Sequence, residues 1–478
     1  MVHVLERLAR HQGHMPLRNA IIQFVTGVIA LASGQSGGRE GPAIHLGAAG
    51  SSLIGHYLKL PNNSIRVLVG CGAAAAISAS FNTPIAGVIF SMEVIIMEYT
   101  IAGFIPAILA SVVAAVMTQF VFGSATAFHV PSVSLGSLFD LPILIAEGVF
   151  IGAIAAVFVK CMVWVYKVAP ESRWSRLLIA GFLTGSAAVL VPEIMGIGYD
   201  TVNLALIGEL SLVALMAAFT LKILVSSAII ALGMPVGVIG PALFIGAMAG
   251  GMFALAAGTL GTELSEDAFY VRLGMGAMMG AVLQAPLAAL MAVLELTNNP
   301  NIILPAMLVI IIANVTASQV FGLRSIFIMQ MEILGLEFRQ NPLSMALNRA
   351  SVASIMVRSF ERVKRHLSLE NAALLVREPP FWLLVESDQR PLFILRTEDL
   401  IQFLSEEQPE EIDLAAIPAT RKDVTSILLQ ATLGEALDTL NQSGVQALYA
   451  NRITAPMMDS PVGIVTREDI EIYYKSYC

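Results

Sequence analysis

Charged residues are scarce in this sequence. Of its 478 residues only 13% are Asp, Glu, Lys or Arg, whereas 56% are hydrophobic, and the mean hydropathy is +0.77. Soluble domains carry about 25% charged residues, so the composition indicates an integral membrane protein. The scarcity is uneven, because Lys222 is the only charged side chain between residues 211 and 262, while the chain after about residue 350 is charged like a soluble domain. Two regions with different surroundings are therefore expected.

Cysteines and basic runs are also few. Cys71, Cys161 and Cys478 lie far apart without metal-type spacing, so the sequence indicates neither a disulfide framework nor a zinc site. The net charge of −8 and the lack of a basic run argue against nucleic acid as a partner. Arg7 and Arg10 precede the first apolar segment, and no small-residue cleavage site follows, so no cleavable signal peptide is expected.

Long apolar runs are present, but many are interrupted. Uninterrupted candidate spans are Ala20–Ala32, Ile101–Val121, Leu144–Val165, Leu177–Val191, Leu212–Leu232 and Ile302–Val320. Between them lie segments rich in Gly and Pro. Non-helical backbone at membrane depth is tolerated only where protein buries it or where it lines a water-filled path. These interrupted segments are therefore where function is expected.

The interrupted segments occur twice. "GREGPAIHLGAAGSSL" around Pro42 matches "GVIGPALFIGAMAGGM" around Pro241, and "PAILASVVAAVMTQFVFG" matches "PAMLVIIIANVTASQVFG", each 199 residues later. A third pair ends at Glu93 and Glu295, each nine residues after a proline. Duplicated segments with broken helices predict a transporter built from two repeats, with its substrate site where half-helices meet.

The two Gly-Pro segments predict helix starts inside the membrane. Proline in the first turn of a helix costs no hydrogen bond, and the preceding glycines let the backbone bend, so Gly41-Pro42 and Gly240-Pro241 should each begin a helix. A helix N-terminus exposes free N–H groups and the positive end of the dipole, which attract an anion without a full positive charge. A small anion is therefore the expected substrate, bound weakly enough to leave again.

These residues resemble a known family. "GREGP", "GMPVGVIGPALFIGA", "LELTNN" and "SIF" are similar to motifs of the CLC chloride channels and chloride/proton antiporters, over about residues 4 to 345. The resemblance implies an all-α polytopic membrane domain with inverted repeats of broken helices, homodimers with one pore per subunit, and passive or proton-coupled chloride transport across what is expected to be a bacterial inner membrane. No catalytic role, metal or cofactor is expected for transport.

The resemblance also implies the site residues. Glu40 stands at the position of the gating glutamate. The expected anion-binding positions are Gly38, Arg39, Gly41, Pro42, Gly237, Val238, Ile239, Gly240, Pro241 and Phe327. Ile239 replaces the usual phenylalanine, and Phe327 replaces the usual tyrosine, whose hydroxyl contacts the anion.

Two further departures bear on mechanism. The family's Gly-Ser-Gly-type loop normally precedes the segment "HVLERLARHQG", whereas this sequence begins at Met1, so the first helices of the family fold are expected to be missing. Antiporters usually carry a glutamate directly after the position of Glu93, on the proton path, and Val94 stands there instead. Val94 favours a channel but leaves antiport open.

Several residues keep two interpretations. "GQSGG" fits a serine-hydrolase motif with Ser36 and His45, but that motif needs a preceding strand, which the sequence lacks. Glu93 and Glu295 are either ion ligands or structural partners of helix ends, and their matched positions favour structure. Lys222 and Glu147 fall within apolar spans, where an ionisable side chain either has a function or serves helix packing or snorkels to the membrane interface.

The last region predicts a different fold. "FWLLVES" and "RPLFILRTEDLIQFL" read as strand, strand and helix, and "VQALYAN" with "SPVGIVTREDIEIYY" repeats the order about 70 residues later. The tandem resembles a cytosolic CBS pair, giving a transport domain over 1–347 and a small α+β domain over 348–478. Thr466 and Asp469 match the adenine-nucleotide motif, where the first repeat has Arg396 and Asp399, but the same pattern is also a helix capping box. The alternative to chloride transport is a CBS-bearing magnesium transporter or regulatory membrane protein, which would need several converging carboxylates.

Overall fold

The structure is a computed structural model that describes residues 1–123, 128, 140–259, 267–336, 346–387, 390–406, 409, 411–452 and 460–477. The chain divides into two compact units, of which the first comprises 1–57 and 65–338 and the second comprises 58–64 and 339–478. Each unit is described by itself. Whether the second unit is a CBS pair that begins at residue 348 stays a prediction.

The first unit is helical throughout its described residues. Its first half contains α1 (Val2–Arg10), α2 (Leu17–Ala32), α3 (Glu40–Tyr57), α4 (Asn62–Phe81), α5 (Pro84–Phe90), η1 (Ser91–Ile96) and α6 (Ile101–Phe122). Its second half contains α7 (Leu141–Val168), α8 (Arg173–Leu190), η3 (Pro192–Ile194), α9 (Tyr199–Leu206), α10 (Leu212–Ala231), α11 (Ile239–Thr259), α12 (Asp267–Leu283), α13 (Pro286–Thr297), η4 (Pro300–Ile302), α14 (Ile303–Val315), η5 (Thr316–Val320) and α15 (Ile326–Ile333).

The helices agree with the apolar runs. All six expected spans lie on helices, with ends that shift by a few residues. Six helical stretches of the described chain are long and apolar enough to cross a membrane, and four of them coincide with expected spans; the other two are α4 and most of α11, whereas the helices that hold the expected spans Ala20–Ala32 and Leu177–Val191 are not among the six. Large apolar side chains on their outer faces are strongly exposed, for example Phe120 at 91% and Val189 at 84%. Such faces suit lipid, because lipid tails are as apolar as these side chains.

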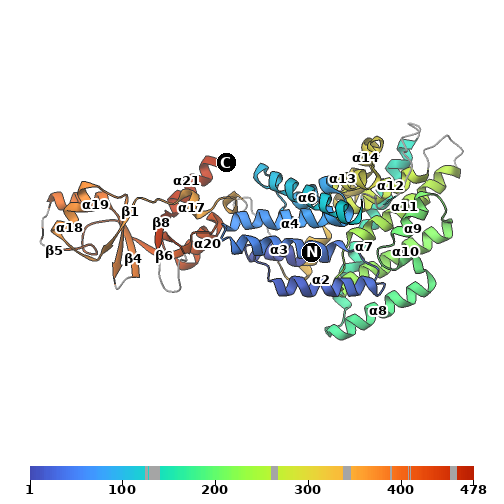
Figure 1. Cartoon of the computed structure of the whole chain (residues 1–478), viewed down its shortest axis with the longest axis horizontal. Coiled ribbons are helices and arrows are strands. Elements are labelled where there is room, and N and C mark those ends of the chain that lie inside the picture. Colours follow the sequence, from blue (N-terminus) through green and yellow to red (C-terminus); the bar gives the residue numbers. More distant parts are fainter. Residues whose placement is uncertain are drawn as a thin grey trace. The chain divides into compact units, whose positions relative to one another are not determined.

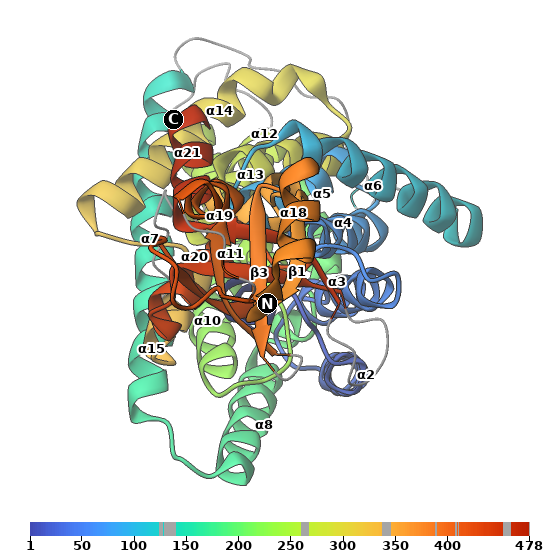
Figure 2. The ribbon, with the colours of Figure 1, turned by 90° about the vertical axis from the view of Figure 1, so that its left-hand side faces the viewer.

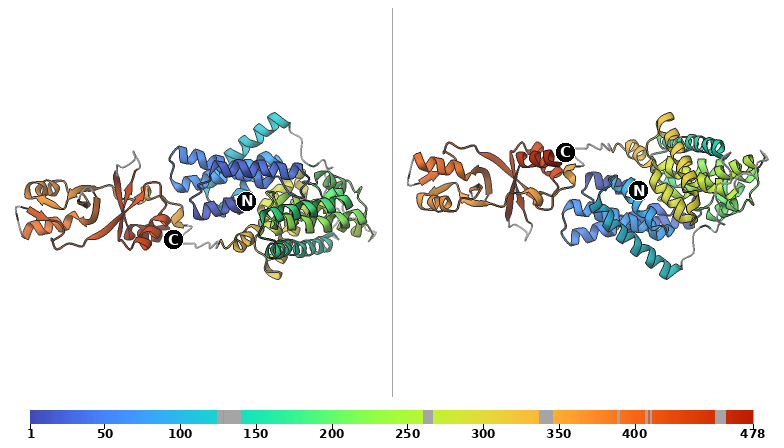
Figure 3. Two further views of the ribbon diagram at one scale, coloured as in Figure 1. Left: turned by 90° about the horizontal axis from the view of Figure 1, so that it is seen from below. Right: turned by 90° about the horizontal axis from the view of Figure 1, so that it is seen from above.

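The helices follow the sequence repeat in order, with α2 to α6 corresponding to α10 to α14. Figure 3 shows the helices of the first repeat, drawn in blue, as a group beside the green and yellow helices of the second half. Both Gly-Pro helix starts are confirmed, since α3 begins at Glu40 and α11 at Ile239. Within residues 1–123, all of which the structure describes, no helices correspond to α7 and α8.

Two glutamates show that the repeats are inverted. Glu93, just after α5, accepts hydrogen bonds from the backbone N–H groups of Leu287 and Ala288 at the start of α13, over 3.4 and 2.7 Å. Glu295, near the end of α13, accepts bonds from Ile85 and Ala86 at the start of α5, over 2.9 and 2.7 Å. Each helix start thus meets the other helix end, so α5 and α13 are antiparallel. A twofold axis perpendicular to the helices relates the halves, which confirms the inverted repeat and supports the structural interpretation of Glu93 and Glu295.

Glycines let neighbouring helices pack closely at equivalent places of the two repeats. A Cβ atom at Gly47 of α3 would collide with the carbonyl of Gly72 on α4. In the second repeat a Cβ at Gly246 of α11 would collide with the carbonyl of Gly274 on α12. Small residues at such crossings allow backbones to approach, which is how membrane helices gain packing energy.

The second unit is built on a six-stranded sheet in the order β1-β3-β4-β6-β7-β8, with a separate β2–β5 pair. Its strands and helices are α17 (Val352–Ile355), β1 (Phe360–Lys364), β2 (His366–Ser368), α18 (Leu369–Arg377), β3 (Trp382–Ser387), β4 (Arg390–Arg396), α19 (Thr397–Glu406), β5 (Glu411–Asp413), β6 (Lys422–Leu428), α20 (Leu433–Ser443), β7 (Ala447–Asn451), β8 (Pro461–Thr466) and α21 (Arg467–Tyr477). The expected strand, strand and helix order is confirmed in both halves.

The two halves of the sheet repeat one pattern. β1 pairs with β3 in parallel and β3 with β4 in antiparallel, and β6, β7 and β8 repeat this order. Figure 2 shows β1 and β3 side by side. In Figure 1 the sheet lies between α18 and α19 on one side and α20 and α21 on the other, so the unit has an α+β layered fold.

Candidate functional site

The site is organised by the loops that precede α3 and α11. Gly38 and Gly237, one from each repeat, pair as an isolated antiparallel bridge in which both N–H groups donate, with N···O distances of 3.0 and 2.6 Å. The bridge holds the two helix starts together. Because a helix N-terminus exposes free N–H groups, the place where these starts meet can hold an anion.

The Glu40 side chain occupies that place. Its Oε1 accepts a hydrogen bond of 2.5 Å from the backbone N–H of Ile239, the first residue of α11, and the residue is only 2% exposed. Oε2 is buried and has no hydrogen-bond partner within the described part of the chain. A Cβ at Gly38 or at Gly237 would collide with the carboxylate, so both glycines leave room for it.

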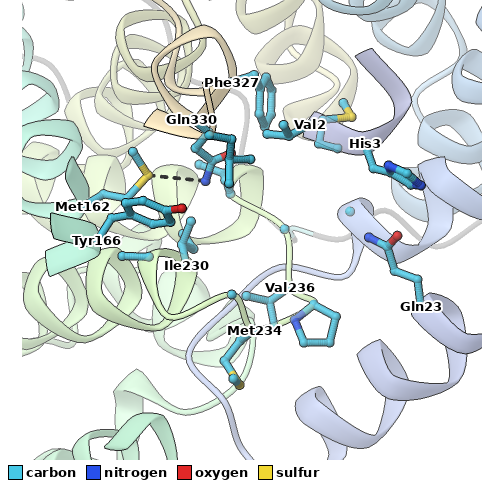
Figure 4. Close-up of a pocket in the computed structure, with 18 of the residues that line it drawn as sticks. Val2, His3, Gln23, Met162, Tyr166, Ile230, Met234, Val236, Phe327 and Gln330 are labelled. Atoms are coloured by element: carbon cyan, nitrogen blue, oxygen red, sulfur yellow. Dashed lines mark hydrogen bonds between the residues drawn. The ribbon is translucent and has the colours of Figure 1, made fainter. Parts of the chain in front are cut away.

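A cavity of about 470 Å³ opens beside Glu40. Its walls include five of the expected site residues, Gly41, Gly237, Val238, Ile239 and Phe327, together with Glu40. Figure 4 shows Phe327 above the cavity, with His3 and Gln23 on one side and Met162, Tyr166 and Gln330 on the other. Phe327 lies at the start of α15 and offers no hydroxyl, so that position gives the cavity an apolar ring.

The remaining expected site residues lie nearby but do not line this cavity. Gly38 makes the bridge described above, and Gly240 and Pro241 belong to the first turn of α11. Arg39 and Pro42 line a second cavity of about 500 Å³. The Arg39 guanidinium donates to the carbonyl of Ser80 and lies over the rings of Phe81 and Tyr199, at 5.7 and 5.9 Å from their centroids.

Val94 lies on η1 and is buried, at 3% exposure. The structure therefore buries an apolar side chain at the position where, by the resemblance, antiporters usually carry a glutamate.

Lys222 has a structural explanation. Its buried Nζ donates to the carbonyls of Ile194 and Gly196, both over 2.9 Å, and lies 4.6 Å from the ring centroid of Phe244. The N–H of Gly196 in turn donates to the carbonyl of Gly34, at the head of the loop that leads to Glu40. Lys222 therefore holds the segment of Ile194 and Gly196, which in turn is bound to the loop before α3 through its own backbone. Glu147 on α7 is fully buried, and neither of its oxygens has a hydrogen-bond partner among the described residues.

The enzyme-like motif does not form a catalytic pair. The Ser36 hydroxyl lies 3.1 Å from the hydroxyl of Ser226 and is preceded by helix α2, not by a strand. Both ring nitrogens of His45 are buried without a hydrogen-bond partner among the described residues, so His45 does not activate Ser36.

Three or more His, Cys, Asp or Glu side chains do not gather as a metal site anywhere in the described chain. Cys71 and Cys161 are free thiols, and Cys478 lies outside the described residues.

Thr466 and Asp469 form the helix cap that the sequence allowed. Asp469 Oδ2 accepts from the backbone N–H and the hydroxyl of Thr466, over 2.8 and 2.7 Å, and the backbone N–H of Asp469 donates to the Thr466 hydroxyl over 3.3 Å. Arg396 and Asp399, their counterparts in the first half, lie at the junction of β4 and α19. Nucleotide binding at either position stays a prediction.

Sequence reasoning missed several cavity residues. His3 and Glu6 of α1, Met162 and Tyr166 of α7 and Gln330 of α15 all line the cavity beside Glu40. The His3 and Glu6 positions carry a weak signal, because residues three apart share one face of a helix. Met162, Tyr166 and Gln330 carry none, since only the packing of α7 and α15 brings them to the site.

Comparison with known proteins agrees with this geometry. A family model described as voltage gated chloride channel matches residues 1–318. A ClcB-like chloride channel protein of Ralstonia nicotianae is 30% identical over 325 residues, which cover 66% of this chain and 75% of that protein. The H(+)/Cl(−) exchange transporter ClcA of Vibrio cholerae serotype O1 is 29% identical over 301 residues, which cover 59% of this chain and 63% of that exchanger, less than two thirds of its length.

Among solved structures, a slow cyanobacterial Cl−/H+ antiporter superposes with a TM-score of 0.62 at 23% identity, covering 69% of this chain and 81% of that one. At this identity the likeness establishes the fold. Together with the family match over residues 1–318 and the helix starts around Glu40, it leads to one assignment. The chain belongs to the voltage-gated chloride channel (CLC) family.

Proposed function

We propose that the chain carries chloride and similar small anions past the starts of α3 and α11, and that Glu40 gates this path and takes up the proton that couples to it. One observation carries the proposal: the Glu40 carboxylate accepts a 2.5 Å hydrogen bond from the N–H of Ile239, at the helix start where a chloride ion would bind. The ionised side chain is then a tethered competitor of the anion.

Protonation opens the path in this mechanism. A neutral carboxylic acid is attracted less to the positive end of the α11 dipole, so the side chain can leave and an anion can take its place. The site then attracts the anion with N–H groups and helix dipoles. The guanidinium of Arg39 is held elsewhere, by the carbonyl of Ser80 and the rings of Phe81 and Tyr199. Binding by dipoles suits a transported ion, which has to enter and leave.

Exchange with protons is favoured by the relatives. The Vibrio cholerae relative is named an H(+)/Cl(−) exchange transporter, and the Ralstonia nicotianae relative is named a chloride channel protein. Val94 stands where, by the resemblance, antiporters carry a glutamate on the proton path. Exchange of chloride for protons in this chain therefore requires a proton route that does not use residue 94.

The test is chloride and proton flux in liposomes for Glu40→Gln, a neutral side chain of the same size. We expect chloride flux that no longer rises at acid pH and proton flux that is lost, because residue 40 no longer titrates. Glu209→Gln removes an exposed carboxylate after α9 and is the matched control. If Glu40→Gln keeps the pH dependence of the wild type, Glu40 is a structural residue and the proposal is wrong.

We also propose that the second unit is a cytosolic CBS pair and that the protein acts as a homodimer in a bacterial inner membrane. The duplicated strand and helix pattern supports the CBS proposal, and the family membership supports the dimer. An adenine nucleotide at Thr466 and Asp469 would have to bind beside the capping box. Calorimetric titration of the full chain with ATP tests nucleotide binding. The same titration of Thr466→Val is the control, because it removes the hydroxyl at the expected site.

A further inference from the structure

The cavity beside Glu40 also reaches two titratable side chains of α1. His3 and Glu6 line the same 470 Å³ space as Glu40. Their side chains form a pair, with 3.0 Å between His3 Nδ1 and Glu6 Oε2, and they are 31% and 25% exposed. Both groups are therefore more open to water than Glu40, which is only 2% exposed.

A third titratable group links this pair to the helix of Glu40. The ring of His45, five residues after Glu40 on α3, lies 5.4 Å from the ring of His3, centroid to centroid. His45 is 1% exposed, and both its ring nitrogens lack a hydrogen-bond partner among the described residues. A buried imidazole without a partner is costly and needs a reason.

The surroundings of the pair are otherwise poor in free acids and bases. α1 packs against α3, η1 and α15. The titratable or charged groups of α3, η1, α15, the rest of α1 and the cavity walls are the amino group of Met1, Arg7, Arg10, Glu40, His45, His56, Tyr57, Glu93, Glu332, Tyr166 and Arg176. Glu93 is bound to the start of α13, and Glu332 is paired with Arg324. His3 and Glu6 are thus the acid–base pair of the cavity that is both exposed and close to Glu40.

We propose that His3 and Glu6 form a proton relay between water and Glu40, which stands in for the carboxylate missing at Val94. The inference rests on the proposed function of Glu40. Protonated Glu6 gives its proton to Nδ1 of the neutral His3 ring, and His3 releases a proton from Nε2 to water in the cavity. That water protonates the Glu40 carboxylate. Glu6, left as a carboxylate, then takes up a proton from water, and His3 exchanges its Nδ1 proton for one on Nε2 through water, so the relay returns to its starting state. The position fits, because α1 packs on η1, the segment that carries Val94.

The experiment measures chloride and proton flux together in liposomes containing the full chain. We expect Glu6→Gln and His3→Gln each to lower the ratio of protons to chloride at least about tenfold, since a positioned acid or base speeds proton transfer by that order or more. Chloride flux should fall far less than proton flux, because Glu40 can still be protonated from the opposite side of the membrane, which opens the path without carrying a proton across; this remaining flux also shows that the variants are folded. His11→Gln, an exposed histidine just after α1, is the matched control and should leave the ratio unchanged.

The outcomes separate this inference from the function of Glu40. An unchanged ratio in both α1 variants, with the ratio lost in Glu40→Gln, overturns the relay and leaves the gate in place. Equal loss of chloride and proton flux shows a structural role for the pair and also overturns the relay. A wild type that moves no protons overturns it too, while the pH dependence of chloride flux in Glu40→Gln still tests the gate. Glu6→Asp, which keeps a carboxylate, should restore most of the ratio.

Discussion

The reciprocal contacts of Glu93 and Glu295 allow a stability prediction with unequal magnitudes. Each glutamate binds the first N–H groups of the other repeat's helix, but the bonds differ. Glu295 makes two good bonds, of 2.9 and 2.7 Å, whereas Glu93 makes one of 2.7 Å and a second of 3.4 Å. A bond at 3.4 Å contributes little. The structure therefore predicts that two positions related by the repeat differ in their contribution to stability.

The magnitudes follow from replacing each side chain by glutamine. A hydrogen bond to a charged group contributes about 1.5–3 kcal/mol and a neutral one about 0.5–1.5 kcal/mol, and glutamine keeps one acceptor oxygen. Glu295→Gln should then cost about 2–5 kcal/mol and Glu93→Gln about 1–2 kcal/mol, with partial exposure of both favouring the lower ends. The two carboxylates act at opposite ends of α5, about 10 Å apart, so the double variant should cost nearly the sum.

The assay is the unfolding of the full chain in detergent, followed as the loss of the monodisperse peak in gel filtration after heating. Glu332→Gln, which removes an exposed partner of Arg324, is the control and should cost less than about 1 kcal/mol. The reasoning fails if Glu93→Gln destabilises as much as Glu295→Gln, or if neither substitution lowers the unfolding temperature. Unchanged stability together with altered ion flux would instead favour the ion-ligand interpretation of these two residues.

Two further predictions concern a buried lysine and a surface ion pair. Lys222→Met should destabilise the protein by about 2–6 kcal/mol, because two buried carbonyls, of Ile194 and Gly196, lose their donor; an unfolding temperature equal to that of the wild type would contradict this. Arg365 donates two 2.9 Å hydrogen bonds to the carboxylate of Asp413. These bonds hold the pKa of Asp413 well below its usual range. The pair therefore stabilises the β2–β5 contact fully above about pH 4, and this stabilisation is lost as the pH falls through the lowered pKa. Asp413→Asn should therefore weaken the hydrogen-exchange protection of β2 and β5 more at pH 7 than near pH 2, and an equal loss at both pH values would show that charge is not the cause.

Local chemistry made much of the fold predictable from the sequence. The six expected spans are helices, and α3 and α11 begin within two residues of Pro42 and Pro241. Proline and glycine determine the backbone by their own geometry, so a short segment was enough to place these helix starts. The strand and helix order after residue 381 follows from short continuous apolar runs, such as those of β3 and β7, each bounded by polar segments.

The partners of side chains were less predictable. The matched positions of Glu93 and Glu295 indicated helix-end contacts, but not that each binds the helix of the other repeat. The bond from Ile239 to Glu40 joins residues 199 positions apart. The pairing of Ser36 with Ser226, and the place of His3 and Glu6 in the Glu40 cavity, depend on helix packing that no short segment encodes.

The gate that we propose rests on a single break in the symmetry of the two repeats. Glu40 and Ile239 occupy equivalent positions, 199 residues apart, each at the first residue of its helix. The fold thus brings two similar helix starts to one point. There the Glu40 carboxylate of one repeat accepts a hydrogen bond from the backbone N–H of Ile239, the equivalent residue of the other repeat. Carboxylates at both positions would place two negative charges together and repel each other as well as the anion. Apolar side chains at both would leave the path without a group that takes up a proton. In the mechanism that we propose, one glutamate facing one isoleucine is the combination that both closes the path and lets protonation open it.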